Sequence, residues 1–166
     1  GWLVNSPQKT YEYYNPVVMS KMFLLHDASI YNTFETEFYF WVDAGLTMTV
    51  DMRLLTRADI IEKFTDFANP FLFLSFPYLN NDELHGFKAD RLKELCTELP
   101  KYCCRGGLFG GHKSQISEAN AMYYGLVEST LAQGYMGTEE TLFTVMAMNN
   151  PQVYRRYMLD ESGHIY

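Results

Sequence analysis

Continuous apolar runs along this chain are separated by stretches with helical spacing. Residues 38–42 and 71–74 are unbroken apolar or aromatic runs, which are typical of strands buried on both faces of a sheet. Residues 101–104 predict a third, shorter strand that leads directly into glycines. In residues 47–50 threonines alternate with apolar residues, a pattern that predicts one more short strand.

Helical patterns lie between these runs. The first helix is predicted to begin with Asn15 as its cap and Pro16 in its first turn, where the missing N–H costs nothing. Its apolar stripe comprises Val18, Met19, Met22, Phe23 and Leu25. Further helices are predicted over 56–67, 88–98 and 114–131 and from 138 until Asn149, with a loop over 77–86.

This alternation of helices and strands predicts an α/β fold with a mostly parallel central sheet flanked by helices. At 166 residues the chain is long enough for one domain spanning 1–166 with a core of its own. The run 38–42 is expected at the centre of that sheet.

Asp43 follows the central run and precedes the small residues Ala44 and Gly45. Ligands of open α/β sheets bind beyond the carboxyl ends of the strands, so Asp43 is a candidate site residue that a bulky ligand or a metal can approach. The alternative is that Asp43 merely caps the next turn, with Gly45 in a positive-φ conformation.

Four glycines lie within residues 106–111, just before His112. Such a segment predicts a tight turn whose bare N–H groups can approach a ligand closely, beside the start of a helix capped by Ser114. The spacing fits neither a dinucleotide fingerprint nor a P-loop. The alternative is a strand-to-helix turn that binds nothing.

Two further candidates also have simple structural interpretations. Glu139 and Glu140 follow Thr138, and acids in the first turn of a helix interact favourably with its dipole. Lys21 lies near the apolar stripe of the first helix, where its alkyl stem could cover the edge of that stripe.

Composition narrows the function classes. The net charge is −7 and the 13 basic residues are scattered, which argues against nucleic-acid binding because phosphates require a basic patch. The three cysteines, Cys96, Cys103 and Cys104, have no metal-binding spacing, and an odd count favours a reducing, cytoplasmic compartment. No apolar run approaches the length of a transmembrane segment, and no signal peptide is visible.

Four ordered motifs carry a family resemblance. They are Asn15-Pro16 through Ser20-Lys21, residues 40–45, Phe109-Gly110-Gly111 and residues 134–140. Together they resemble the HtrL/YibB family, which is grouped with nucleotide-diphospho-sugar transferases of the GT-A type. The resemblance runs from about Tyr14 to Tyr157.

The resemblance implies a metal-dependent glycosyltransferase that uses a nucleotide sugar, most simply a UDP-sugar, and a glycan or other hydroxyl acceptor. Asp43 would hold Mn²⁺ or Mg²⁺ against the donor diphosphate, and Glu139 or Glu140 would lie near the reacting carbon as a stabiliser, an orienting group or a base. The remaining candidates for donor or acceptor binding are Lys21, Trp41, Gly110, Gly111 and His112.

The sequence departs from the GT-A pattern in two respects. The second acid of the metal motif is replaced by Gly45, so another ligand would have to come from His112, Asp51 or His164. About fifteen residues precede Pro16, too few for an N-terminal nucleotide-binding βαβ unit. The chain is therefore a fragment, pairs with another segment, or has lost donor binding.

Four aromatic side chains are candidates for stacking on a sugar or base, although each could instead be a core residue. They are Tyr39, Trp41, Phe109 and Tyr135.

The competing functional class is a non-catalytic sugar- or protein-binding module in which Asp43 is structural. A metal hydrolase is weaker, because the four histidines form no obvious ligand set.

Overall fold

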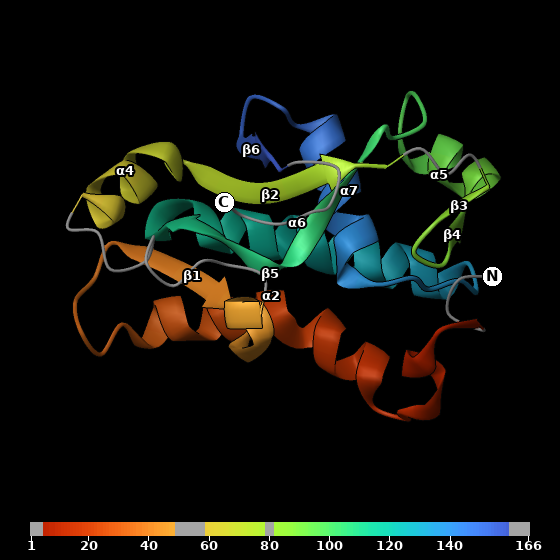
Figure 1. The fold of residues 1–166 in the computed structure, drawn as a ribbon, viewed down its shortest axis with the longest axis horizontal. Coiled ribbons are helices and arrows are strands. Elements are labelled where there is room, and N and C mark those ends of the chain that lie inside the picture. The colour runs from red at the N-terminus through yellow and green to blue at the C-terminus, as the bar shows by residue number, and fades with distance from the viewer. Residues whose placement is uncertain (1–4, 49–58, 79–81, 160–166) are drawn as a thin grey trace.

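The computed structural model describes residues 5–48, 59–78 and 82–159. Its centre is a four-stranded sheet with the order β1-β5-β2-β6, shown in Figure 1. The strands are β1 (Phe38–Val42), β5 (Tyr102–His112), β2 (Phe71–Pro77) and β6 (Tyr154–Met158). Strand β5 is antiparallel to both β1 and β2, and β2 pairs in parallel with β6.

The expectation of a mostly parallel sheet is therefore wrong, although the α/β class is confirmed. The reason lies in the glycine-rich residues 106–111, which continue β5 as a strand instead of forming a turn. A Cβ at Gly110 would collide with the Tyr39 carbonyl of β1, and one at Gly111 would collide with the Pro70 carbonyl. These glycines let the neighbouring chain approach β5 closely.

The apolar run 71–74 is buried on both faces of the sheet, as predicted. In β2, Phe71 and Phe73 point into the main core, while Leu72 and Leu74 belong to a second cluster. Side chains alternate between the faces of a strand, so a sheet covered on both sides needs apolar residues at every position. The run 38–42, in contrast, forms the edge strand β1, whose side chains are half-buried or exposed, and it is not at the sheet centre.

Three helices form the layer that covers the main core (Figure 1). They are α2 (Tyr14–Tyr31), α6 (Lys113–Ala132) and α7 (Glu139–Asn149). Helix α7 packs against β5, while α2 packs against β1 and α6. Phe64 of the short helix α4 (Ile60–Phe67) packs on the second cluster instead.

Helix positions agree with the sequence patterns, while several ends differ. Helix α2 begins at Tyr14, so Asn15 lies inside its first turn and is not its cap. Helix α6 is capped by His112, whose side chain accepts a hydrogen bond from the Ser114 N–H. The charged helix expected over 88–98 is shorter, as α5 (Ala89–Leu95), and residues 56–58 of the helix expected over 56–67 lie outside the described part.

The remaining connections include short elements that the patterns missed. A 3₁₀ helix, η1 (Pro7–Thr10), precedes α2. A second one, η2 (Ala44–Met48), occupies the start of the strand expected over 47–50, and Thr49 and Val50 lie outside the described residues. The expected loop over 77–86 contains β3 (Glu83–Leu84), which pairs with β4 (Phe87–Lys88) through a turn with positive φ at His85 and Gly86.

Candidate functional site

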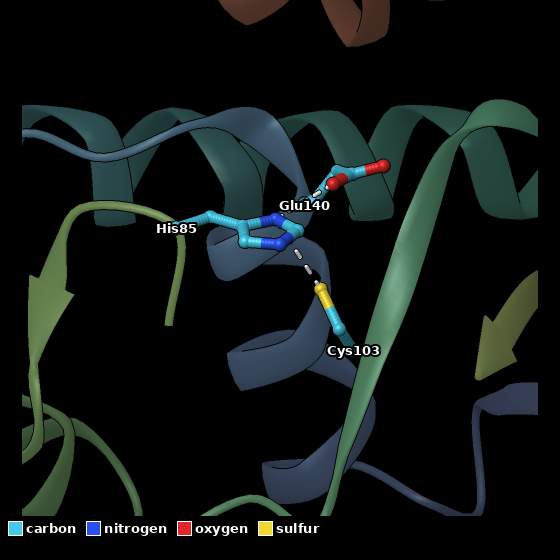
Figure 2. Close-up of side chains that lie close together, drawn as sticks. All are labelled: His85, Cys103 and Glu140. Atoms are coloured by element: carbon cyan, nitrogen blue, oxygen red, sulfur yellow. Dashed lines mark hydrogen bonds and ion pairs between the residues drawn. The ribbon is translucent and has the colours of Figure 1, made fainter. Parts of the chain in front are cut away.

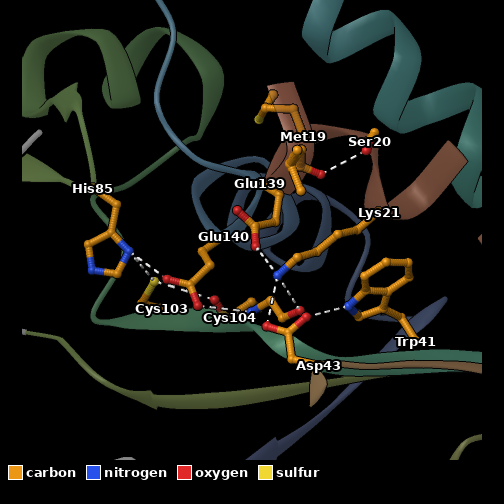
Figure 3. A network of polar contacts seen from close by, with 12 residues as sticks. Met19, Ser20, Lys21, Trp41, Asp43, His85, Cys103, Cys104, Glu139 and Glu140 are labelled. Atoms are coloured by element: carbon orange, nitrogen blue, oxygen red, sulfur yellow. Dashed lines mark hydrogen bonds and ion pairs between the residues drawn. The ribbon is translucent and has the colours of Figure 1, made fainter. Parts of the chain in front are cut away.

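A buried lysine lies at the centre of the site. Lys21 of α2 is only 6% exposed. Its Nζ lies 3.0 Å from Asp43 Oδ2, 2.9 Å from Glu139 Oε1 and 3.1 Å from the Gly106 carbonyl oxygen. Figure 3 shows the two carboxylates pointing toward the ammonium. An ammonium has three N–H donors, so Lys21 is fully hydrogen-bonded and does not simply cover the edge of an apolar stripe.

Asp43 lies where β1 ends. Its backbone N–H donates to the Gly107 carbonyl, and its own carbonyl accepts from the N–H of Leu46 within η2. The side chain turns toward Lys21, and its second oxygen accepts a 2.6 Å hydrogen bond from Trp41 Nε1. The side chain is 39% exposed, so Asp43 is the solvent-accessible acid of the cluster.

Glu139 lies behind Lys21, in the first turn of α7, and is 3% exposed. A Cβ at Gly106 would collide with its carboxylate, so a glycine is needed at that position of β5. Burial raises the pKa of Glu139 to about 7, against the opposing effect of Lys21.

The positive charge of Lys21 is held by both of its carboxylate partners. Burial alone would lower its pKa, but Glu139 and Asp43 reverse that effect and raise the pKa above its usual value. Because Asp43 also pairs with Lys21, the ammonium keeps a counter-ion when Glu139 is protonated.

The neighbouring Glu140 belongs to a different cluster. Its Oε2 lies 2.7 Å from His85 Nδ1, and its Oε1 accepts a 2.9 Å hydrogen bond from the Gly106 N–H. Although burial disfavours its charge, the hydrogen bond and charge of His85 lower the pKa of Glu140. Gly106 thus joins the clusters, through its carbonyl to Lys21 and through its N–H to Glu140.

An open groove reaches the lysine cluster from outside. It has a volume of about 670 Å³, and Lys21, Trp41 and Asp43 are among its lining residues. The remaining lining residues are Thr10, Tyr11, Glu12, Tyr13, Tyr14, Val17 and Val18. Tyr11 and Tyr13 are 67% and 68% exposed, so the groove is lined by aromatic rings as well as by the charged pair of Lys21 and Asp43.

Gly110 and Gly111, the second pair of glycines in residues 106–111, lie away from this groove. Gly110 pairs with Phe40, and Gly111 pairs with Tyr39. At about 3.3 Å per residue, Gly110 is roughly 13 Å along β5 from Gly106. His112 caps α6, hydrogen-bonds Ser114 and packs edge-on against Phe38. The prediction of a turn that brings Gly110 and Gly111 to Asp43 is therefore wrong. Instead, Gly106 is the glycine whose carbonyl shares Lys21 with Asp43.

Of the proposed stacking residues, Trp41 lines the groove. Phe109 is fully buried in the main core. The hydroxyl of Tyr39 hydrogen-bonds to Asn32, and Tyr135 packs edge-on against Phe87. The three other rings therefore have packing or hydrogen-bonding partners within the fold.

The geometry around Asp43 does not fit Mn²⁺ or Mg²⁺. Such ions prefer several oxygen ligands, yet both oxygens of Asp43 are engaged, by Lys21 and Trp41. The other carboxylate that lines the groove belongs to the exposed Glu12. Of the other ligands suggested by sequence, His112 lies at the far end of β5, and Asp51 and His164 lie outside the described residues.

Sequence reasoning missed the partners of Glu140 and the tyrosines of the groove. His85 and Cys103 are 18 residues apart and belong to no motif, so no spacing marks them. Tyr11, Tyr13 and Tyr14 alternate loosely in the sequence, which was the one available sign of the groove wall.

Fold and site together define a mixed α/β protein with a mostly antiparallel sheet and a buried lysine–carboxylate centre. The HtrL_YibB family, described as a bacterial protein of unknown function, matches residues 3–160, and the chain belongs to this family. No curated protein matches the sequence at a significant level. Among the described residues, no helix is both long and apolar enough to cross a membrane.

Proposed function

We propose that this protein is a glycosyltransferase that transfers a sugar from a nucleotide-diphosphate donor to a hydroxyl acceptor. The observation that supports this most strongly is the tyrosine-lined groove whose lining also includes Lys21, Trp41 and Asp43. Ring faces flank sugars well because they present apolar surface next to polar groups, and the charged lining residues offer groups for the reacting atoms. The GT-A-like architecture implied by the family resemblance is part of this proposal.

Each residue of the centre has a distinct role in the proposed reaction. The acceptor oxygen forms a bond to the anomeric carbon while the bond from that carbon to the donor phosphate breaks, and its electron pair leaves with the diphosphate. Asp43 orients the acceptor hydroxyl and takes its proton. Lys21 places a positive charge beside the departing phosphate, and Glu139 is a positioning residue that acts through Lys21.

Mn²⁺ or Mg²⁺ would supply the same charge neutralisation if bound with the donor. Because the residues around Asp43 do not offer a ligand set for such an ion, no step of the proposed reaction passes through one. The ion stays a prediction from the resemblance. A UDP-sugar as donor and a glycan as acceptor are predictions of the same kind.

A second candidate is a non-catalytic sugar-binding module. It is favoured by the engagement of both Asp43 oxygens, by Trp41 Nε1 and Lys21 Nζ. A carboxylate held in this way can hydrogen-bond a sugar without acting as a base. Both candidate functions use the groove, but only the glycosyltransferase would convert its ligand to product.

The compartment belongs to the proposal as well. Cys96, Cys103 and Cys104 are buried free thiols, which supports a reducing environment such as the cytoplasm.

The experiment combines binding with turnover. Purified protein is screened against UDP-sugars, with Mn²⁺ or with a chelator, for a rise in Tm and for release of UDP with glycan acceptors. A ligand that binds the folded state alone raises Tm. Asp43→Asn should abolish UDP release, whereas Asp27→Asn, which alters an exposed acid of α2, should leave it unchanged.

The outcomes separate the candidates. UDP release that depends on Asp43 supports the transferase. A rise in Tm with a sugar but no UDP release supports the binding module. The absence of any shift with the whole UDP-sugar and glycan panel would contradict both.

A further inference from the structure

A second group of metal-ligating side chains lies outside the groove. His85 comes from the turn between β3 and β4, Cys103 from β5 and Glu140 from the first turn of α7. Figure 2 shows the three side chains converging. One ligand atom from each residue lies within 4.8 Å of the others.

The separation of the sulfur and nitrogen ligand atoms is close to the one that a tetrahedral zinc ion requires. Bonds of about 2.3 Å to sulfur and about 2.0 Å to nitrogen place those two ligand atoms roughly 3.5 Å apart. Cys103 Sγ lies 3.6 Å from His85 Nδ1. His85 Nδ1 and Glu140 Oε2 are closer, at 2.7 Å, so the carboxylate would need to retreat by under about 1 Å to admit the ion.

We propose that His85, Cys103 and Glu140 form a Zn²⁺ site with a water molecule as the fourth ligand. The set combines a thiolate, an imidazole and a carboxylate, which are the ligand types of zinc. Thiolate ligation disfavours Mg²⁺ and Mn²⁺, which prefer oxygen. The site uses none of the residues that line the groove, so it does not depend on the proposed transferase function.

The surroundings suit a metal site. The Gly106 N–H holds the other oxygen of Glu140, which is the kind of outer hydrogen bond that orients a metal-binding carboxylate. The side chains of His85 and Glu140 are 13% and 21% exposed, so the site is accessible to an ion from solvent. Cys103 is fully buried and provides the inner ligand.

Binding of Zn²⁺ releases protons from the ligand side chains. The Cys103 S–H bond breaks, the sulfur electron pair forms the bond to Zn²⁺, and the proton leaves to the buffer. Any proton on His85 Nδ1 is likewise released or moves to Nε2, so that Nδ1 can donate its lone pair. No oxidant or reductant takes part.

The test uses Zn²⁺ and Co²⁺ as probes on the full chain. Protein freed of metal with a chelator is titrated with Zn²⁺ against a chromophoric competitor, and Tm is measured with and without the ion. Co²⁺ reports the sulfur ligand through thiolate-to-cobalt charge-transfer absorption. We expect one Zn²⁺ per chain, a rise in Tm and a cobalt–thiolate spectrum.

The variants identify the ligands. Losing an outer-shell partner typically weakens metal binding about 10- to 100-fold, so Cys103→Ser, which removes a ligand, should weaken it by at least about 100-fold. It should also remove the charge-transfer band. Cys96→Ser is the matched control, because Cys96 is another buried free thiol and should leave both signals unchanged.

A further variant covers the case in which Cys103→Ser does not fold. Glu140→Gln keeps the size and hydrogen-bonding capacity of the side chain while weakening its ligation. It should lower Zn²⁺ affinity and retain the charge-transfer band. The proposal is overturned if the wild type binds no stoichiometric Zn²⁺, or if affinity is the same in Glu140→Gln.

Discussion

Glu139 and Glu140 are neighbours at the start of α7, yet they lie in opposite electrostatic environments. Glu139 is buried against Lys21, and its pKa is raised to about 7. Glu140 pairs with His85 and the Gly106 N–H, and its pKa is lowered. Successive helix positions point about 100° apart, so the two acids belong to two separate clusters on either side of Gly106.

The comparison shows that the charge state of an acid is set by its partners and not by its position in a helix. Both residues lie in the first turn, where the helix dipole favours a negative charge. That shared effect does not decide the outcome, because the pKa of Glu139 rises through desolvation while that of Glu140 falls through hydrogen bonding.

The largest expected effect comes from removing the cation of the first cluster. Lys21→Met leaves the buried Glu139 without its counter-ion, and breaking a buried ion pair typically costs about 3–5 kcal/mol. The free energy of unfolding from urea denaturation measures the loss. Lys21→Met with Glu139→Gln should recover part of it, since the only acid then left without its partner is Asp43, whose side chain is 39% exposed.

Lys63→Met provides the matched control for that prediction. Lys63 is 67% exposed and pairs with Asp59 on the surface, where ion pairs contribute little, so its replacement should hardly change stability. A loss for Lys21→Met as small as that for Lys63→Met would mean that the cluster does not hold the fold together.

The pH dependence of stability should have opposite signs for the two glutamates. The folded-state pKa of Glu139 is above its unfolded value of 4.5, so its contribution to stability is lost as pH rises from about 4.5 to 7, by at most about 3 kcal/mol. Glu140 has a lowered pKa, so its contribution is present above the unfolded pKa and is lost as pH falls below it.

Urea unfolding between pH 4 and 8, with a chelator present, checks this difference. Relative to the wild type, Glu139→Gln should gain stability as pH rises from about 4.5 to 7, whereas Glu140→Gln should lose stability as pH rises toward about 4.5 and change little above it. If both variants shifted in the same direction, the separation of the two clusters would be wrong.

A glycine substitution tests the peptide that joins the two clusters. Gly106→Ala places a Cβ against the Glu139 carboxylate, and overpacking of this kind typically costs about 1–3 kcal/mol. Gly125→Ala is the control: its Cβ meets nothing within 4 Å in α6, and alanine favours a helix, so stability should rise by up to about 1 kcal/mol. Equal effects on Tm at the two sites would contradict the close approach of Glu139.

The sequence predicted the helices and the apolar strands well, since periodicity and runs of apolar residues report burial directly. It did not predict strand direction. An apolar run such as 71–74 looks the same in a parallel and an antiparallel sheet when both faces are covered. Strand β6 was missed because four of its five residues, 155–158, are exposed and form no apolar run.

The candidate site was predicted in part. Lys21, Trp41, Asp43 and Glu139 lie together, and the motif order had indicated each of them. Gly110, Gly111 and His112 do not join them, because glycines next to a helix look alike whether they form a turn or a closely packed strand. His85 and Cys103 could not be found from spacing, since their contact depends on how the β3–β4 turn lies against β5.

The smallest expected effect concerns the exposed end of the lysine cluster. Trp41→Phe removes the hydrogen bond from Nε1 to Asp43 Oδ1. A hydrogen bond to a charged group typically contributes about 1.5–3 kcal/mol. Because Asp43 is 39% exposed and water can replace the donor, we expect a loss of about 1 kcal/mol or less in the free energy of unfolding.

A double-mutant cycle of Trp41→Phe with Asp43→Ala, measured by urea denaturation, isolates the coupling energy of this pair. A coupling energy well below that of Lys21 with Glu139 would show that the buried side of the cluster holds the fold, and that its exposed side is free to meet a ligand. Equal coupling energies would instead make Asp43 a structural residue and favour the binding module.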